Sequence, residues 1–191
     1  TGKTVGIVGF GRTGSGVAKR LQGGDANVIT YDPYVSPEKA AMLGVKMVDT
    51  LDELLESADY VTLHLVVTPE TTRMIGEEQL RKMKPTAYLI NTSRGQVLDD
   101  EAFCKAINEN WIAGGALDVY WQEPLNLDSP LRDLDPIRVT LTPHNAALSP
   151  DSRVGNLKLA IQGALEALRG EVPTNIVNPD IIPAWKKRFG R

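Results

Sequence analysis

Three glycines near the start of the chain have the spacing of a phosphate-binding loop. Gly9, Gly11 and Gly14 form the pattern G-x-G-x-x-G directly after an apolar run, and a helix-like segment follows them. The first glycine allows a tight turn, the second lets the backbone approach a pyrophosphate, and the third lets the helix lie close to the strand. The helix N-terminus offers N–H groups and a positive dipole end to the phosphates, and Arg12 and Thr13, between the second and third glycines, are further candidate cofactor contacts.

An acidic residue, Asp32, follows a second apolar run eighteen residues after the last of these glycines. A carboxylate at the end of the second strand can accept a hydrogen bond from a ribose 2′-hydroxyl. It would repel the 2′-phosphate of NADP, and no arginine follows it within six residues. The order of strand, glycines, helix, strand and acid therefore predicts NAD as the cofactor. The alternative is that Asp32 only opens the Asp32-Pro33 turn.

Three residues that could bind an anion or move a proton follow later apolar runs. Arg94, Glu123 and His144 lie in three successive segments, each just beyond an expected strand. Ligands of a doubly wound sheet bind outside the C-terminal ends of its strands, so these side chains are candidates for catalysis. Taken singly, each has a plainer interpretation: a solvated loop arginine, a turn residue before a proline, and a structural histidine. A further histidine, His64, we interpret as structural or as lining the cleft.

Apolar strands alternate with helical segments nearly to the end of the chain. This pattern predicts an α/β fold, namely a Rossmann-type doubly wound, mostly parallel sheet with helices on both faces. The expected strands are Thr4–Val8, Ala26–Tyr31, Val45–Val48, Tyr60–Leu63, Ala87–Asn91, Gly115–Asp118 and Val139–Leu141. The expected helices are Gly14–Leu21, Pro37–Leu43, Leu51–Ser57, Glu77–Met83 and Asp100–Asn110.

The chain is expected to divide near residue 150. Residues 1–150 would form the Rossmann domain, with a long loop over Gln122–Asp135. Residues 151–191 would form a long helix and a tail that is too small to be a domain. Ser149 suits the N-cap of that helix and Pro150 its first turn, an apolar stripe runs along it, and Gly170 ends it.

The composition excludes some partners. The chain has 191 residues, of which 42% are hydrophobic and 24% charged, and its net charge of −3 argues against nucleic acid or an anionic membrane surface. No apolar run approaches the roughly 20 residues of a membrane span. The lone Cys104 excludes an internal disulfide and is consistent with a reducing compartment, so we expect a cytoplasmic location. We assign no metal ligands.

Three motifs in this order resemble the NAD-binding domain of the D-isomer-specific 2-hydroxyacid dehydrogenases. They are the glycine fingerprint with its acid, the stretch from Tyr88 through Arg94-Gly95 to Asp99, and the stretch from Gly115 through Asp118 to Glu123-Pro124-Leu125. The resemblance covers residues 1 to about 150. It implies an NAD-dependent oxidoreductase that acts on a small 2-hydroxy or 2-keto acid.

The resemblance also implies roles for single residues. Arg94 would bind the substrate carboxylate and polarise the keto oxygen, a task that suits the planar donors of a guanidinium. His144 would give a proton to that oxygen as hydride arrives, and Glu123 would hydrogen-bond and orient the histidine ring. The implied cofactor contacts, beyond the glycine loop and Asp32, are Thr68, Thr92, Asp118, His144 and Ala146.

Members of this family have a second domain, built mostly from residues before the first strand, which completes the substrate pocket. Only three residues precede the first expected strand here. We therefore expect an excised portion that binds NAD but turns over substrate poorly or not at all, with the segment Val172–Arg191 mobile or re-docked. A homodimer through the NAD-binding domain is implied, with the Trp121–Asp135 loop as a contact.

Other classes remain open. A β-hydroxyacid dehydrogenase also begins with this fingerprint but needs a large helical second domain with a catalytic lysine, whereas one long helix follows here. Formate dehydrogenases of the same superfamily surround their histidine with a different set of residues. An NAD(H)-sensing regulator similar to transcriptional co-repressors of this fold is the alternative outside the enzymes. The sequence does not identify the hydroxy acid.

Overall fold

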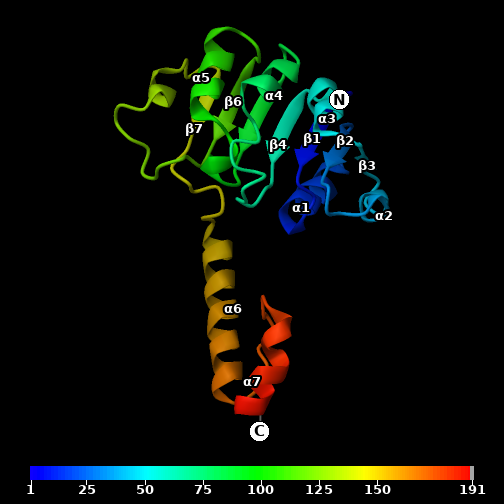
Figure 1. The fold of residues 1–191 in the computed structure, drawn as a ribbon, viewed down its shortest axis with the longest axis vertical. Helices are drawn as coiled ribbons and strands as arrows, with labels where there is room; N and C mark the ends of the chain where they lie inside the picture. The colour runs from blue at the N-terminus through cyan, green and yellow to red at the C-terminus, as the bar shows by residue number, and fades with distance from the viewer. Residues whose placement is uncertain (190–191) are drawn as a thin grey trace. The chain divides into compact units, whose positions relative to one another are not determined.

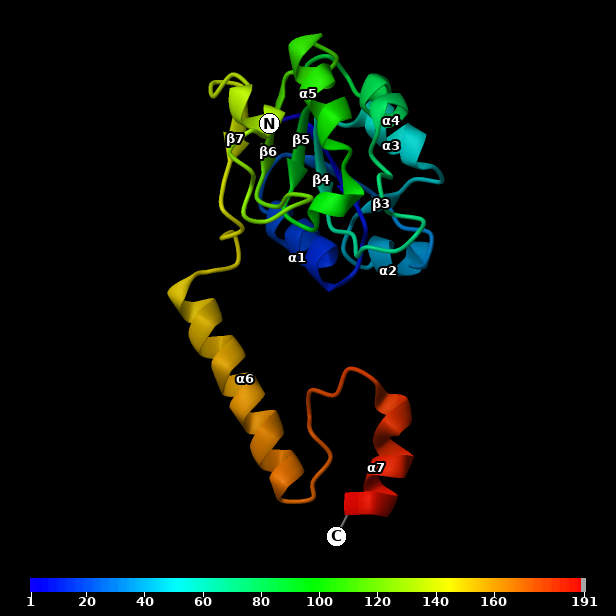
Figure 2. The same ribbon diagram turned by 60° about the vertical axis from the view of Figure 1, so that its left-hand side comes forward.

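The computed structural model of the chain describes residues 1–189. It divides into two units, one from Thr1 to Asn145 and a second that begins at Ala146, five residues before the first residue of the expected appendage. The first unit is a seven-stranded sheet in which all paired strands are parallel, in the order β3-β2-β1-β4-β5-β6-β7, with helices on both faces (Figures 1 and 2). The predicted α/β, doubly wound fold is confirmed.

The expected elements of the first unit are all present, and their ends differ from the predicted ends by at most two residues. The strands are β1 Thr4–Val8, β2 Asn27–Tyr31, β3 Lys46–Met47, β4 Tyr60–Leu63, β5 Tyr88–Asn91, β6 Gly114–Leu117 and β7 Val139–Leu141. The helices are α1 Arg12–Leu21, α2 Pro37–Ala41, α3 Leu51–Ser57, α4 Glu77–Lys82 and α5 Asp100–Asn108, with short 3-10 turns η1 Gly95–Val97 and η2 Pro130–Asp133. The turn η2 lies within the segment that we expected to be loop throughout.

Apolar residues on each face of the sheet pack against the helices that cover that face, which gives two hydrophobic cores. Successive residues of a strand point to opposite faces, and in β1 Ile7 joins the core beneath α1 and α2 while Val8 joins the core beneath α3, α4 and α5. The second core is the larger one and includes Leu54, Leu80 and Phe103 from its three helices. Cys104 of α5 is buried there as a free thiol.

The strand order brings the candidate residues to one edge. The sheet grows outward from β1 in both directions, to β2 and β3 on one side and to β4 through β7 on the other. In such a sheet, ligands bind beyond the C-terminal ends of the strands at the point where the strand order reverses, which here lies between β1 and β4. The glycine loop follows β1, and the segments with Arg94, Glu123 and His144 follow β5, β6 and β7.

The second unit contains α6 Pro150–Leu168, a 3-10 turn η3 Pro179–Ile181 and α7 Ile182–Phe189. The predicted caps of α6 are confirmed: Ser149 Oγ accepts from the Ser152 N–H at 3.1 Å, and Gly170 follows the helix with φ of +80°. No residue of α6 is buried within the described chain, so its apolar stripe is exposed. The last two residues of the expected mobile tail, 190 and 191, lie outside the described residues. No helix within residues 1–189 combines the length and the apolar character that a membrane crossing requires.

Candidate active site

The protein itself requires glycine at two positions of the fingerprint. Gly9 has φ of +91°, and a Cβ there would lie 2.6 Å from the backbone oxygen of His64. A Cβ at Gly14 would lie 2.0 Å from the backbone oxygen of Gly9. These contacts are with backbone atoms, so any side chain would force β1, β4 and α1 apart. The roles predicted for the first and third glycines, a tight turn and close packing of helix on strand, are consistent with this geometry.

Gly11 differs from both. A Cβ built on this residue meets no atom of the described chain within 4 Å, and its φ of −69° is open to any residue. It is the N-cap of α1, where no side chain caps the helix and no acidic residue lies in the first turn, which contains the exposed Arg12 and Thr13. Open space beside a helix N-terminus whose first turn contains no acidic residue fits the approach of a pyrophosphate.

The Asp32 carboxylate is held against the glycine loop. Its Oδ2 accepts the N–H of Phe10 at 2.7 Å, and its Oδ1 accepts the N–H of Tyr34 at 2.9 Å. The second bond is the turn that we considered as the alternative, so Asp32 forms that turn and is also tied to the loop between Gly9 and Gly11. An ionised carboxylate has about four acceptor sites. Sites therefore remain for a ribose hydroxyl.

The other predicted cofactor residues outside α1 follow β4, β5, β6 and β7. Thr68 forms a turn in which its N–H donates to Thr71 Oγ1 at 2.8 Å. Thr92 is exposed, and Ala146 is the first residue of the second unit. His64, after β4, is half-buried with Nε2 3.1 Å from Thr62 Oγ1, and burial lowers the pKa of its ring, which favours the neutral form.

The loop that holds Arg94 is organised by a buried amide. Asn91, with no exposed surface, donates from Nδ2 to the Arg94 backbone oxygen at 3.0 Å and accepts at Oδ1 from the N–H and Oγ–H of Ser93. Gly95 then passes so close to the next loop that a Cβ would lie 1.9 Å from the carbonyl carbon of Tyr120. The Arg94 side chain is exposed, and its guanidinium donates to the Ser93 backbone oxygen at 2.6 Å.

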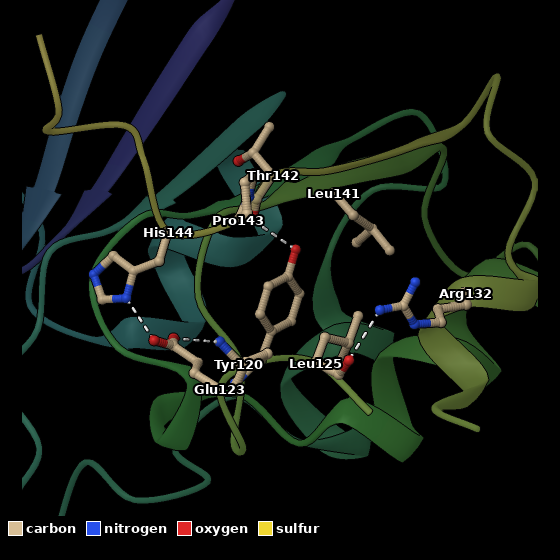
Figure 3. A pocket seen from close by; sticks show the side chains of 9 residues that line it. Tyr120, Glu123, Leu125, Arg132, Leu141, Thr142, Pro143 and His144 are labelled. Atoms are coloured by element: carbon tan, nitrogen blue, oxygen red, sulfur yellow. Dashed lines mark hydrogen bonds and ion pairs between the residues drawn. The ribbon is translucent and has the colours of Figure 1, made fainter. Parts of the chain in front are cut away.

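Glu123 and His144, twenty-one residues apart, form a hydrogen-bonded pair (Figure 3). Glu123 Oε2 lies 2.6 Å from His144 Nδ1, and Glu123 Oε1 accepts the Tyr120 N–H at 3.1 Å. The hydrogen bond from His144 lowers the pKa of the Glu123 carboxyl below its ordinary value. Because Nδ1 is engaged, Nε2 is the ring atom that can exchange a proton with a substrate, and Figure 3 shows it pointing away from Glu123.

Asp118 holds the chain on both sides of this histidine. Its carboxylate is 4% exposed, and Oδ1 accepts from Thr142 Oγ1 at 2.6 Å and from the Asn145 N–H at 2.9 Å. Between these two contacts His144 has φ of +51°, in the left-handed region that a non-glycine residue rarely adopts. Asp118 therefore stabilises the backbone conformation that presents the histidine ring. Its expected contact with the nicotinamide stays a prediction.

A cavity of about 590 Å³ lies beside the pair (Figure 3). Its lining is mostly apolar and consists of Tyr120, Glu123, Pro124, Leu125, Arg132, Leu141, Thr142, Pro143 and His144. The Arg132 guanidinium is anchored to the backbone oxygens of Leu125 and Asn126 at 2.9 and 2.8 Å. In Figure 3 the His144 Nε2, the ring nitrogen that does not contact Glu123, points away from the Arg132 side of this cavity.

Sequence reasoning missed three residues that shape the site: Asn91, Tyr120 and Thr142. Each lies at or just after the end of a strand. The Asn91 amide holds its own loop at Ser93 and Arg94, whereas the hydroxyls of Tyr120 and Thr142 contact a segment that follows another strand. The sequence feature that could have indicated them is a polar side chain at or after a strand end, where such side chains often form hydrogen bonds with the nearby backbone. That feature does not indicate which loop each side chain reaches.

Asp100, the first residue of α5, is a half-buried carboxylate next to the Trp121 backbone. Burial, with a smaller contribution from Asp99, raises the pKa of its carboxyl from 3.8 to about 6. The unfolded chain releases this proton near pH 3.8, so between pH 3.8 and 6 the folded chain binds more protons than the unfolded chain. The contribution of Asp100 to the free energy of unfolding therefore falls as pH rises through this range.

An Asp100→Asn variant lacks this titration. We expect its free energy of unfolding, relative to that of the parent chain, to rise as pH increases through the range between the two pKa values and to level off above it. Urea unfolding at a series of pH values measures this difference, with Asp25→Asn on an exposed turn as the matched control. A difference that does not vary with pH would show that Asp100 titrates normally.

The chain is similar to proteins of one known family over most of its length. A family profile described as "D-isomer specific 2-hydroxyacid dehydrogenase, NAD binding domain" matches residues 1–146. The chain is 45% identical over 181 residues to a glyoxylate reductase of Korarchaeum cryptofilum, covering 95% of this chain and 54% of that protein. It is 40% identical over 185 residues to a D-3-phosphoglycerate dehydrogenase of Methanocaldococcus jannaschii, covering 97% and 35%.

A solved structure agrees with these relatives. The NAD-complexed form of a D-isomer specific 2-hydroxyacid dehydrogenase from Lactobacillus delbrueckii ssp. bulgaricus superposes with a TM-score of 0.82 at 34% identity, covering 92% of this chain and 56% of that one. The chain spans about half the length of the glyoxylate reductases that it matches.

Proposed function

The chain belongs to the D-isomer-specific 2-hydroxyacid dehydrogenases, of which it contains the NAD-binding domain, and from this premise we propose that it is the cofactor-binding part of an enzyme that transfers hydride between NAD(H) and a small 2-hydroxy or 2-keto acid. The observation that carries this proposal is the 2.6 Å hydrogen bond between Glu123 Oε2 and His144 Nδ1 at the C-terminal edge of the sheet. A carboxylate that orients an imidazole is an arrangement for general acid–base catalysis.

The glycine loop and Asp32 would hold the cofactor. The N–H groups at the start of α1 would bind the pyrophosphate across the open space beside Gly11, and the free acceptor sites of Asp32 would bind a ribose hydroxyl. When bound, NAD accepts or supplies the hydride. The further cofactor contacts that we propose are Arg12, Thr13, Thr68, Thr92, Asp118, His144 and Ala146.

His144 would act as the acid or base from Nε2. In the reducing direction it donates a proton to the keto oxygen, and in the oxidising direction it takes the proton back from the hydroxyl. Glu123 favours the ring with a proton on Nδ1, since Oε2 can only accept there. Arg94, which forms no ion pair among the described residues, would bind the substrate carboxylate through two parallel hydrogen bonds.

Glyoxylate is the substrate that we propose to test first. Several relatives that are 39–45% identical to this chain are glyoxylate reductases, and one at 40% is a D-3-phosphoglycerate dehydrogenase. Both names describe enzymes of small hydroxy or keto acids. We further propose a cytoplasmic protein that forms a homodimer through the NAD-binding domain, with the Trp121–Asp135 loop, where Leu127 is 90% exposed, at the contact.

Calorimetric titration of the chain with NADH and with NADPH tests the proposal. We expect saturable binding with NADH preferred at least about tenfold, roughly 1.4 kcal/mol, and loss of that preference in Asp32→Ala but not in the exposed Asp25→Ala. We also expect no measurable oxidation of NADH with glyoxylate, because the chain spans about half of its glyoxylate reductase relatives.

The opposite results are equally informative. A preference for NADPH would contradict the role of Asp32, and the absence of binding to either nucleotide would contradict the cofactor site. Steady-state reduction of glyoxylate by the 191-residue chain would contradict the proposed inactivity. A protein partner captured only in the presence of NADH would favour the regulator over the enzyme.

A further inference from the structure

The Tyr120 side chain joins the ends of two strands. Its hydroxyl oxygen lies 3.0 Å from the backbone oxygen of Leu117, the last residue of β6. It lies 2.8 Å from the backbone oxygen of Thr142, directly after β7, and Figure 3 shows this second contact. The side chain is 5% exposed, and burial raises the pKa of the phenol, so the hydroxyl keeps its proton and donates. The same Thr142 oxygen accepts the His144 N–H at 3.0 Å. One carbonyl oxygen thus links the Tyr120 hydroxyl to the His144 backbone.

The Tyr120 backbone reaches the other member of the pair. Its N–H donates to Glu123 Oε1 at 3.1 Å, while Oε2 of the same carboxylate lies 2.6 Å from His144 Nδ1. Tyr120 therefore donates a hydrogen bond to Glu123 from its main chain, and its side chain is linked to the His144 backbone through the Thr142 carbonyl oxygen. The hydrogen bond between Glu123 and His144 closes this loop of contacts.

Packing and hydrogen bonds both hold the Tyr120 ring. Tyr120 is a buried member of the larger core, and it also lines the cavity of about 590 Å³. On its other side the residue is confined by the loop after β5, since Gly95 passes close to the Tyr120 carbonyl. The contacts of the hydroxyl with the backbone oxygens of Leu117 and Thr142 are an additional constraint, which a phenylalanine would lose.

We propose that Tyr120 is a positioning residue whose hydroxyl, through the Thr142 carbonyl, keeps the His144 ring within hydrogen-bond distance of Glu123. This inference rests on the proposed function in that the Glu123–His144 pair serves proton transfer there. The pair itself is observable without turnover, because its hydrogen bond is the largest cause of the lowered pKa of the Glu123 carboxyl.

The test compares Tyr120→Phe with Tyr88→Phe in the 191-residue chain. Tyr88 is a matched control because it stacks on Tyr60 and its hydroxyl forms no hydrogen bond among the described residues. The readout is the titration midpoint of the Glu123 carboxyl, followed by carbon NMR with thermal denaturation as the folding check. In the parent chain the hydrogen bond from His144 lowers the Glu123 pKa below 4.5, and we expect Tyr120→Phe to return it toward that value while Tyr88→Phe does not.

Each outcome decides the proposal. A folded Tyr120→Phe chain with an unchanged Glu123 midpoint would overturn it, because the pair would then form without the hydroxyl. A Tyr120→Phe chain that fails to fold would overturn it as well, since the hydroxyl would then serve the fold as a whole. NADH titration of the parent chain tests the proposed function separately, so a chain that binds no NADH but shows the expected shift refutes only the function.

Discussion

Gly11→Val is expected to weaken NADH binding about a hundredfold while it leaves the chain folded and nearly as stable as the parent. A Cβ at Gly11 meets nothing within 4 Å, and φ of −69° suits any residue, so the described chain has no need of glycine there. The same open space is where a pyrophosphate would approach the start of α1. A branched side chain would occupy it, and a hundredfold loss corresponds to about 2.7 kcal/mol.

The free energy of unfolding of Gly11→Val shows whether a loss of NADH binding comes from the cofactor site or from damage to the fold. Valine is a poorer N-cap than glycine but restricts the unfolded chain more, so the free energy of unfolding should change by less than about 1 kcal/mol. Gly16→Ala in the same helix is the matched control, since its Cβ would meet only the end of the Arg20 side chain at 3.5 Å. Calorimetric titration and urea unfolding measure the two effects. Parent-like affinity for NADH in Gly11→Val would place the pyrophosphate elsewhere.

Gly95→Ala is expected to cost about 3 kcal/mol of stability or more, the upper part of the range for overpacking. A Cβ there would lie 1.9 Å and 2.1 Å from the carbonyl carbon and oxygen of Tyr120, and 2.5 Å from the Trp121 nitrogen. These are backbone atoms, so no side-chain rotation relieves the clash and the two loops must separate. Because the displaced loops contain Arg94 and Glu123, the damage falls on the candidate active site.

Urea unfolding followed by tryptophan fluorescence measures this effect. Gly16→Ala serves again as the control, because alanine in a helix is more favourable than glycine by roughly 0.5–1 kcal/mol. The Glu123 titration midpoint in any folded fraction of Gly95→Ala should shift toward the ordinary value, since Tyr120 no longer lies where its N–H meets that carboxylate. A variant within about 1 kcal/mol of the parent would show that the loops can separate at little cost, contrary to the usual cost of overpacking.

Local patterns predicted most of the elements. Alternating apolar strands and helices indicated a doubly wound sheet, and all seven strands were found within two residues of their predicted ends. These features depend on residues close together in the chain, namely the period of the apolar residues and the caps at Ser149 and Gly170. The glycine spacing likewise predicted the turn after β1, because each glycine acts on its immediate neighbours.

Asp32 shows where one local pattern supports two interpretations. The sequence left open whether its carboxylate formed a turn or served a ribose, and the structure shows the turn together with a second bond to Phe10. That second bond joins residues twenty-two positions apart. Only the pairing of β1 with β2 brings them together, so no local rule could have predicted it.

The sequence by itself determined the fold class, the order of the elements, the NAD-binding fingerprint and the identity of the candidate catalytic residues. Only the tertiary structure decided how those residues are held: the clamp of Asp118 across His144, the link from Tyr120 to Thr142, and the close passage of Gly95. Each of these contacts joins loops that follow different strands. Their partners depend on strand order and register, which arise from packing of the whole sheet and not from any single stretch of the chain.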